Sequence, residues 1–256
     1  MPSIDQYSLA TVPIQLLFNG TLLSSGTAFI WQVAGQHYLI TNWHNVSGRD
    51  PNTDRHLSPT AAEPNRLDGF FNTRNANLGD KHHVGLCLRN NGDIAWMVHP
   101  QRKRAVDVVA IPLTGPVTQT IEFHPINKMP SHQIMLAVGI DVFVLGYPFG
   151  PETTGLPVWK RGSIASEPEL VPGTSPCLHI DTASRPGMSG SPVIIRTSGP
   201  YKTPEGNMAI TAGATKFLGV YSGRLRTQDP LEAQIGMVWP AVFIDEIIAG
   251  GLKDYG

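Results

Sequence analysis

The chain is a succession of short β-type runs, each bounded by residues that form turns. The runs cover residues 12–18, 27–33, 37–41, 84–88 and 106–113 in the first half, and 141–147, 158–164, 178–181, 192–196 and 216–221 in the second. Clusters of Gly, Pro, Asn and Ser separate them. Many short strands with turn signals between them are typical of an all-β sandwich or barrel. A chain of 256 residues is long enough for one large all-β domain or two small ones.

The segments between these runs divide the chain further. Polar residues dominate 47–83 and 198–207, which we expect to be loops. The Pro-rich and polar segment 115–132 separates the two sets of strands. A single stretch has apolar residues at helical spacing, between Pro240 and Gly250, so we expect one helix near the C-terminus.

Composition excludes several classes of protein. The net charge is -1 with neutral histidines, which gives no basic excess for binding nucleic acid or an anionic membrane surface. No apolar run approaches the length that spans a bilayer, and the N-terminus lacks the pattern of a signal peptide, so a cytoplasmic location is expected. Cys87 and Cys177 are too few for a disulfide framework, and whether they pair is left open.

Three short motifs carry the residue types of a hydrolase. His44 follows the run YLITNW, Asp107 lies within VDVVAIPL, and Ser189 lies within PGMSGSPV. A serine hydroxyl becomes a nucleophile when a neighbouring base removes its proton, and histidine is suited to that task. A carboxylate behind the imidazole fixes its tautomer. Ser189 is therefore the expected nucleophile, His44 the base and Asp107 the orienting acid.

Glycines on both sides of the serine suggest how the intermediate would be stabilised. Gly187 and Gly190 permit a backbone turn that most side chains would strain. Such a turn can direct the backbone N–H groups of Gly187 and Ser189 towards one point, where they would hold the oxyanion of a tetrahedral intermediate.

These motifs resemble those of the chymotrypsin-like serine peptidases, and within them the bacterial-type trypsin-like domains. The similar segments are SSGTAFIW with HYLITNWHNV, VDVVAIPL, DTASRPGMSGSPV and FLGVYSGR. The resemblance implies one peptidase domain over residues 1–256, made of two perpendicular six-stranded β-barrels. The first, in 1–120, would carry His44 and Asp107. The second, in 121–256, would carry Ser189 and the C-terminal helix.

The resemblance also implies a specificity pocket and shows two departures from the family pattern. Ala183 would form the pocket floor, and the walls would come from Ser184, Tyr221, Ser222 and Gly223. An uncharged floor predicts that Lys and Arg are rejected, whereas Arg185, Arg224 or His179 turned inward would favour acidic residues. The departures are Ser191, where the family usually has glycine, and Met188, where animal digestive enzymes have aspartate.

The predicted function is a serine endopeptidase that forms an acyl-enzyme on polypeptide substrates and needs no cofactor or metal ion. One alternative is a catalytically silent scaffold or binding protein with the same fold, since fold does not imply turnover. A serine esterase of the α/β-hydrolase type fits less well, because its residues occur in the order Ser, acid, His, the reverse of the order here.

Overall fold

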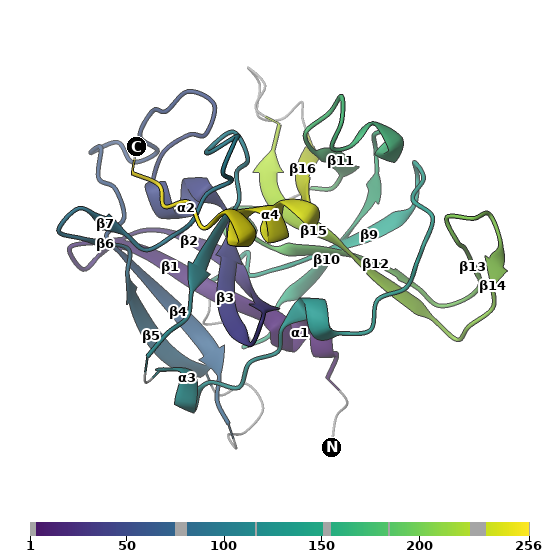
Figure 1. Cartoon of the computed structure of the whole chain (residues 1–256), viewed down its shortest axis with the longest axis horizontal. Helices are drawn as coiled ribbons and strands as arrows, with labels where there is room; N and C mark the ends of the chain where they lie inside the picture. The colour runs from purple at the N-terminus through teal and green to yellow at the C-terminus, as the bar shows by residue number, and fades with distance from the viewer. Residues whose placement is uncertain are drawn as a thin grey trace.

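A computed structural model describes residues 4–74, 81–115, 117–150, 155–183, 185–225 and 234–255. The chain is mostly β, with few helices (Figure 1). The longest described helix has nine residues, and no described helix is long and apolar enough to cross a membrane.

The first half of the chain forms a six-stranded sheet. Its order is β5-β4-β1-β2-β3-β8, and every neighbouring pair is antiparallel. The strands are β1 (Thr11–Phe18), β2 (Thr21–Val33), β3 (Gln36–Thr41), β4 (Arg66–Asn72), β5 (Lys81–Cys87) and β8 (Val109–Pro112).

The second half of the chain forms a closed barrel. Its order is β10-β11-β16-β15-β12-β9, and its strands follow in the right half of Figure 1. They are β9 (Asp141–Gly146), β10 (Val158–Ile164), β11 (Leu178–Asp181), β12 (Pro192–Thr197), β15 (Ala214–Arg224) and β16 (Ile235–Pro240).

Short elements complete the described chain. Two small hairpins are β6 (Arg89–Asn90) with β7 (Asp93–Ile94), and β13 (Tyr201–Lys202) with β14 (Met208–Ala209). The helices are α1 (Gln6–Ala10), α2 (Trp43–Ser47), α3 (Val117–Thr120), α4 (Val242–Gly250) and the 3-10 turns η1 (Ile126–Lys128) and η2 (Pro168–Leu170). Gly251 ends α4 with a φ of 57°, a left-handed conformation that glycine adopts at little cost.

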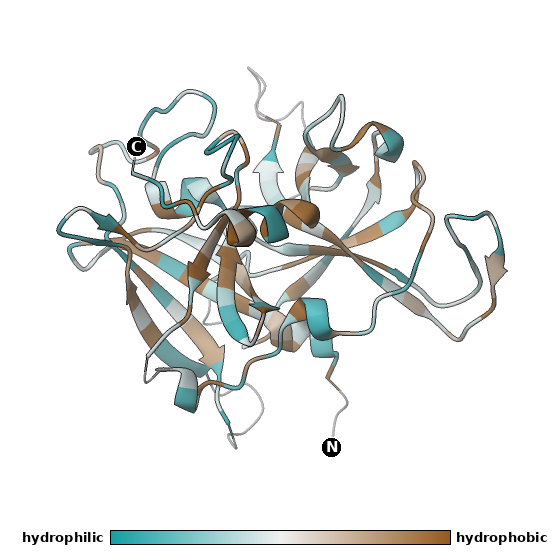
Figure 2. Cartoon of the chain, viewed as in Figure 1, coloured by the Kyte–Doolittle hydropathy of each residue, from teal (hydrophilic) through white to brown (hydrophobic). Residues whose placement is uncertain are grey.

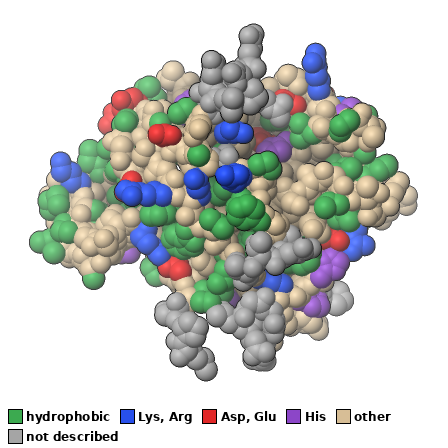
Figure 3. Space-filling view, turned by 180° about the vertical axis from the view of Figure 1, so that it is seen from behind, with side chains coloured by type: hydrophobic (Ala, Val, Ile, Leu, Met, Phe, Trp, Pro, Cys, Tyr) green, Lys and Arg blue, Asp and Glu red, His purple; other side chains and the backbone are tan. Residues whose placement is uncertain are grey.

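Alternation of side chains explains how the strands form a core. In β1, Ile14 and Leu16 are fully buried, whereas Gln15 and Leu17, which alternate with them, are half-buried. Figure 2 shows brown, hydrophobic residues along the strands and teal, hydrophilic residues in many of the loops. On the face in Figure 3, Lys and Arg side chains are interspersed with hydrophobic and acidic ones.

One of three buried clusters joins the two halves. It contains Phe29 and Ile40 from the first sheet, Val220 and Trp239 from the barrel, and Phe243 from α4. The other two clusters lie within the first sheet and within the barrel. The helix α4 therefore packs where the halves meet, as its yellow ribbon in front of both shows in Figure 1.

The expected strand positions all overlap observed strands, but the prediction of a loop over 47–83 is wrong. β4 lies inside that segment and pairs with both β1 and β5. Its sequence RLDGFFN lacks the alternation of apolar and polar residues that predicts a strand, because a charged residue and a glycine occupy buried positions. Asp68 is 7% exposed and pairs with Arg66 and His83, which allows a carboxylate inside the strand. β16 also had no counterpart among the expected runs.

Candidate active site

His44 lies on the short helix α2, directly after strand β3. Asn42 precedes the helix in an extended conformation, and Gly48 ends it with a φ of 71°. The turn between strand and helix brings His44 beside Asp107, which lies 63 residues later and just before β8. β3 and β8 are neighbours in the sheet, so the adjacent ends of two strands carry the two residues.

Asp107 holds His44 through both of its carboxylate oxygens. His44 Nδ1 lies 2.6 Å from Oδ2, and the backbone N–H of His44 donates to Oδ1 at 2.9 Å. Carboxylate oxygens accept hydrogen bonds, so Nδ1 carries the ring proton and Nε2 is left as the acceptor. That is the tautomer needed to take a proton from a serine. Asp107 is only 1% exposed, so water does not compete for these contacts.

A third donor to Asp107 comes from the barrel. The hydroxyl of Ser222, on β15, donates to Oδ2 of Asp107. The sequence suggested Ser222 as a wall of the specificity pocket, but its hydroxyl points at the carboxylate and the residue is 7% exposed. Sequence reasoning missed this contact because 115 residues separate the partners.

The loop that carries Ser189 depends on two glycines in the left-handed region. Gly187 has a φ of 91° and Gly190 a φ of 87°. A Cβ on Gly187 would lie 2.5 Å from the carbonyl oxygen of Tyr147, and a Cβ on Gly190 would collide with that of Thr27. Conformation and space therefore both require glycine at these positions. Among the described residues, the N–H groups of Gly187 and Ser189 have no hydrogen-bond acceptor.

Two donors hold the carbonyl of Ser189. The backbone N–H of Thr27 donates at 2.8 Å, and the side-chain amide of Asn45 donates at 3.3 Å. The same amide nitrogen donates to Thr41 Oγ1 at 3.0 Å. A Cβ on Gly26 would lie 2.9 Å from that nitrogen, so glycine at 26 leaves room for the amide. Asn45, next to His44, thus contacts the backbone of Ser189, a link that no motif in the sequence indicated.

His44, Gly187 and Ser189 line one cavity of about 300 Å³. Asp107 lies behind His44, out of that cavity. The structure thus brings together the three predicted catalytic residues and both predicted oxyanion donors.

The predicted specificity residues are not all gathered in one place. Ala183 is exposed, and Ser184 lies outside the described residues. Tyr221 is 1% exposed, and its side chain belongs to the core of the barrel. Gly223 lies beside Ser189, because a Cβ added to it would be 3.8 Å from Ser189 Oγ.

The two departures from the family pattern fit locally. Ser191 is fully buried, and its hydroxyl occupies the space where a side chain at Gly146 would begin. Met188 is 1% exposed and packs in the barrel core.

Within the part of the chain that the structure describes, the cysteines form no disulfide and the metal-binding residue types form no cluster. Cys87 is exposed and Cys177 is buried, and both are free. Burial raises the pKa of the Cys177 thiol to about 11, which disfavours the reactive thiolate. No group of three or more His, Cys, Asp or Glu in the described chain is arranged to hold a metal ion.

Comparisons with known proteins show the family and the fold of the chain. A family model described as a trypsin-like peptidase domain matches residues 26–199. A search of curated proteins finds no match. Among solved structures, the serine endoprotease from Yersinia pestis is 12% identical with a TM-score of 0.55, covering 97% of this chain and 66% of that one.

Two further structures are similar. The Rv3671c protease from M. tuberculosis in its active form is 19% identical, with a TM-score of 0.50 over 95% of this chain and 81% of that one. An HtrA-type protease solved with a tripeptide is 15% identical, with a TM-score of 0.51 over 94% of this chain and 60% of that one. At these identities the structures show a shared fold.

Proposed function

Since the chain belongs to the trypsin-like peptidase domain family, a family of serine peptidases, we propose that it hydrolyses polypeptides by acylating Ser189. His44 is the general base and Asp107 orients it. The observation that carries the proposal is the 2.6 Å contact between His44 Nδ1 and Asp107 Oδ2, with His44 and Ser189 lining the same cavity.

The chemistry follows from the tautomer of His44. Nε2 takes the proton of Ser189 Oγ–H as Oγ bonds to the substrate carbonyl carbon. The oxyanion that forms accepts from the N–H groups of Gly187 and Ser189. When the C–N bond breaks, Nε2 returns the proton to the leaving amine. Water then attacks the acyl-enzyme by the same route and releases the acid and free Ser189.

Asp107 stabilises the imidazolium that forms in each step. Its carboxylate is buried, and burial of an uncompensated carboxylate is costly. Three donors compensate for it here: two from His44 and one from Ser222. We expect these donors to hold the carboxylate in place during each proton transfer at His44.

The proposal includes a second barrel in the first half of the chain. Its sheet has β5 and β8 at its edges. Ala95 N–H donates to the carbonyl of Leu88, and Met97 and Ala110 exchange two backbone hydrogen bonds. These contacts run from the end of β5 to β8, which supports closure of that sheet into the first of two crossed barrels within one peptidase domain.

The test is covalent labelling by a fluorophosphonate, which reacts with an activated serine. The unmodified protein should be labelled, and Ser189→Ala should not. Asp107→Asn should fold, yet its kcat should fall by a factor on the order of 10⁴, which is the loss known for the equivalent change in a chymotrypsin-like serine protease. Circular dichroism confirms that each variant is folded. Equal labelling of Ser189→Ala and the unmodified protein refutes the assignment, and no labelling of a folded protein favours a silent scaffold.

A further inference from the structure

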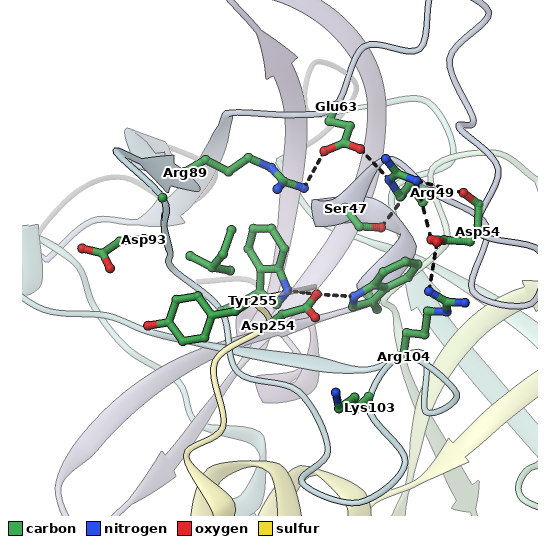
Figure 4. Close-up of a pocket in the computed structure, with 14 residues that line it drawn as sticks. Ser47, Arg49, Asp54, Glu63, Arg89, Asp93, Lys103, Arg104, Asp254 and Tyr255 are labelled. Carbon is green, nitrogen blue, oxygen red and sulfur yellow. Dashed lines mark hydrogen bonds and ion pairs between the residues drawn. The ribbon is translucent and has the colours of Figure 1, made fainter.

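The loop 48–64 has one charged and one uncharged face, and each face lines a different cavity. Arg49, Asp54 and Glu63 line a cavity of about 750 Å³ (Figure 4), and neither His44 nor Ser189 lines it. The active-site cavity is lined from the same loop by Gly48, Leu57, Ser58, Pro59, Ala62 and Pro64. The loop therefore presents only uncharged residues to His44 and Ser189.

Ion pairs on the charged face hold this loop in position. Glu63 accepts from Arg49 Nε at 2.5 Å and lies 3.0 Å from Arg89 Nη2, which belongs to the β6–β7 hairpin. Asp54 lies 3.0 Å from Arg104, three residues before Asp107. Figure 4 shows these side chains converging around Arg49. A loop tied at several points keeps its uncharged face at the catalytic residues.

The uncharged surface continues beyond the active-site cavity. A neighbouring cavity of about 650 Å³ shares part of its lining with the active-site cavity, namely Leu23, Ser24, Ser25, Pro186 and Gly187. Its remaining lining residues are Gln15, Tyr147, Pro148, Phe149 and Gly150. No described Asp, Glu, Lys or Arg lines either one. Leu57 is 43% exposed and Phe149 is 63% exposed, so both offer apolar surface to an occupant. Together the two cavities form one groove, here called the leaving-group groove.

The edge of β2 supplies backbone groups along this groove. Thr27 is opposite Pro13 in the β1–β2 pairing, and Thr27 N–H points away from β1 to Ser189. Two residues earlier, Ser25 is opposite Gln15 and must point the same way, because antiparallel pairs alternate between bonded and non-bonded. β3 pairs with β2 only from Phe29 onward, so the edge at Ser25 is free of β3. An extended peptide can hydrogen-bond there.

The position of His44 decides which half of a substrate this groove receives. The leaving amine takes its proton from His44 Nε2, so the residues that follow the cleaved bond lie on the His44 side of Ser189. His44 lines the groove, and no described residue of β15 does. Gly223 of β15 lies close to Ser189, where the acyl half would pair.

In the proposed peptidase the segment after the cleaved bond lies extended in the leaving-group groove, and we propose that Leu57 selects an uncharged, apolar residue directly after that bond. The inference rests on the proposed peptidase function. A charged side chain at this position would lose hydration against Leu57 and the neighbouring prolines without gaining a counter-ion. One apolar contact of this kind discriminates by about 10- to 200-fold.

The acyl-enzyme gives a direct measure of this selection. A peptide ester acylates Ser189, and amino-acid amides then compete with water for the acyl group, so that each amide must occupy the position next to Leu57. We expect leucinamide to be at least about tenfold more effective than lysinamide or aspartic acid amide. Leu57→Asp should shift the ratio towards lysinamide by about tenfold, and Leu57→Lys should shift it towards the acidic amide by a similar factor. Ratios within one variant cancel any change in acylation rate.

Thr53 offers a matched control on the same loop. It is exposed and lines neither cavity of the groove, so Thr53→Asp and Thr53→Lys should keep the ratios of the unmodified protein. Leu57 variants with unchanged ratios, or Thr53 variants that shift them equally, overturn the role of Leu57. The burst of alcohol from the ester reports separately on acylation and on the folded, active fraction. If the folded, unmodified protein releases no alcohol from the ester, the peptidase function is refuted, and the inference with it.

Discussion

Individual buried polar residues around the site are placed by the contacts they make across the fold. Asp107 meets three donors, and the Ser189 carbonyl meets two. A hydrogen bond to a charged group contributes about 1.5–3 kcal/mol, and a neutral one contributes about 1 kcal/mol. Loss of one neutral donor should therefore lower the catalytic rate without unfolding the protein.

Asn45→Ala tests this at the nucleophile. The variant loses the amide that donates to the Ser189 carbonyl and to Thr41, while the Thr27 N–H remains. We expect kcat to fall by about tenfold with KM changed less than about twofold, because about 1.4 kcal/mol of positioning is lost. Steady-state kinetics on a peptide ester measures both constants. The exposed Asn52→Ala serves as control, and a loss confined to KM would contradict a positioning role.

At the scale of elements, the β4–β5 pair shows how register creates a local environment. Lys81 is directly opposite Asn72, and its ammonium donates to the Asn72 side chain at 2.7 Å. Burial lowers the pKa of Lys81 from 10.5 to about 8. Between about pH 8 and pH 10.5, Lys81 is protonated in the unfolded chain but not in the folded one, so the free energy of unfolding should rise with pH in this range.

Lys81→Met should remove this dependence. The free energy of unfolding of the unmodified protein, relative to that of the variant, should rise between about pH 8 and pH 10.5, by about 3 kcal/mol at most. Urea denaturation at several pH values in this range measures the difference. The exposed Lys128→Met is the control and should follow the unmodified protein. A pH-independent difference between the unmodified protein and Lys81→Met would show that Lys81 keeps its proton over this range.

At the scale of the whole molecule, the site exists only where the two halves meet. His44 and Asp107 come from the first half, and Ser189 and Ser222 from the second. Thr27 joins the halves with its backbone N–H to Ser189 and its hydroxyl to the carbonyl of Gly187. The shared cluster around Phe29 and Val220 buries apolar surface from both sides. The free energy that holds the halves together thus also holds the candidate catalytic residues together.

The two halves should therefore unfold in one transition. Far-UV circular dichroism and loss of fluorophosphonate labelling should have the same urea midpoint. Ile14→Val in the first core and Ile195→Val in the barrel core should each lower both midpoints, at a cost of about 1 kcal/mol. A variant that moves one signal and leaves the other unchanged would show that the halves are independent.

The sequence alone determined where most strands lie and which residue types were candidates for catalysis. Alternation and turn residues are local patterns, and they predicted the strands that carry or flank His44, Asp107 and Ser189. They failed for β4, because its buried Asp68 is compensated by Arg66 and His83 only after the strands have paired. The boundary near residue 120 and the specificity pocket remain predictions.

Which side chains meet across the fold follows from the packing of distant segments. Ser222 lies 115 residues from Asp107, and Asn45 lies 144 residues from Ser189. Charged and uncharged residues in the loop 48–64 do not alternate with a regular period. Ion pairs to Arg89 and Arg104 orient Glu63 and Asp54 away from the active site. Contacts at such separations depend on how the sheet and the barrel pack against each other, which local periodicity does not encode.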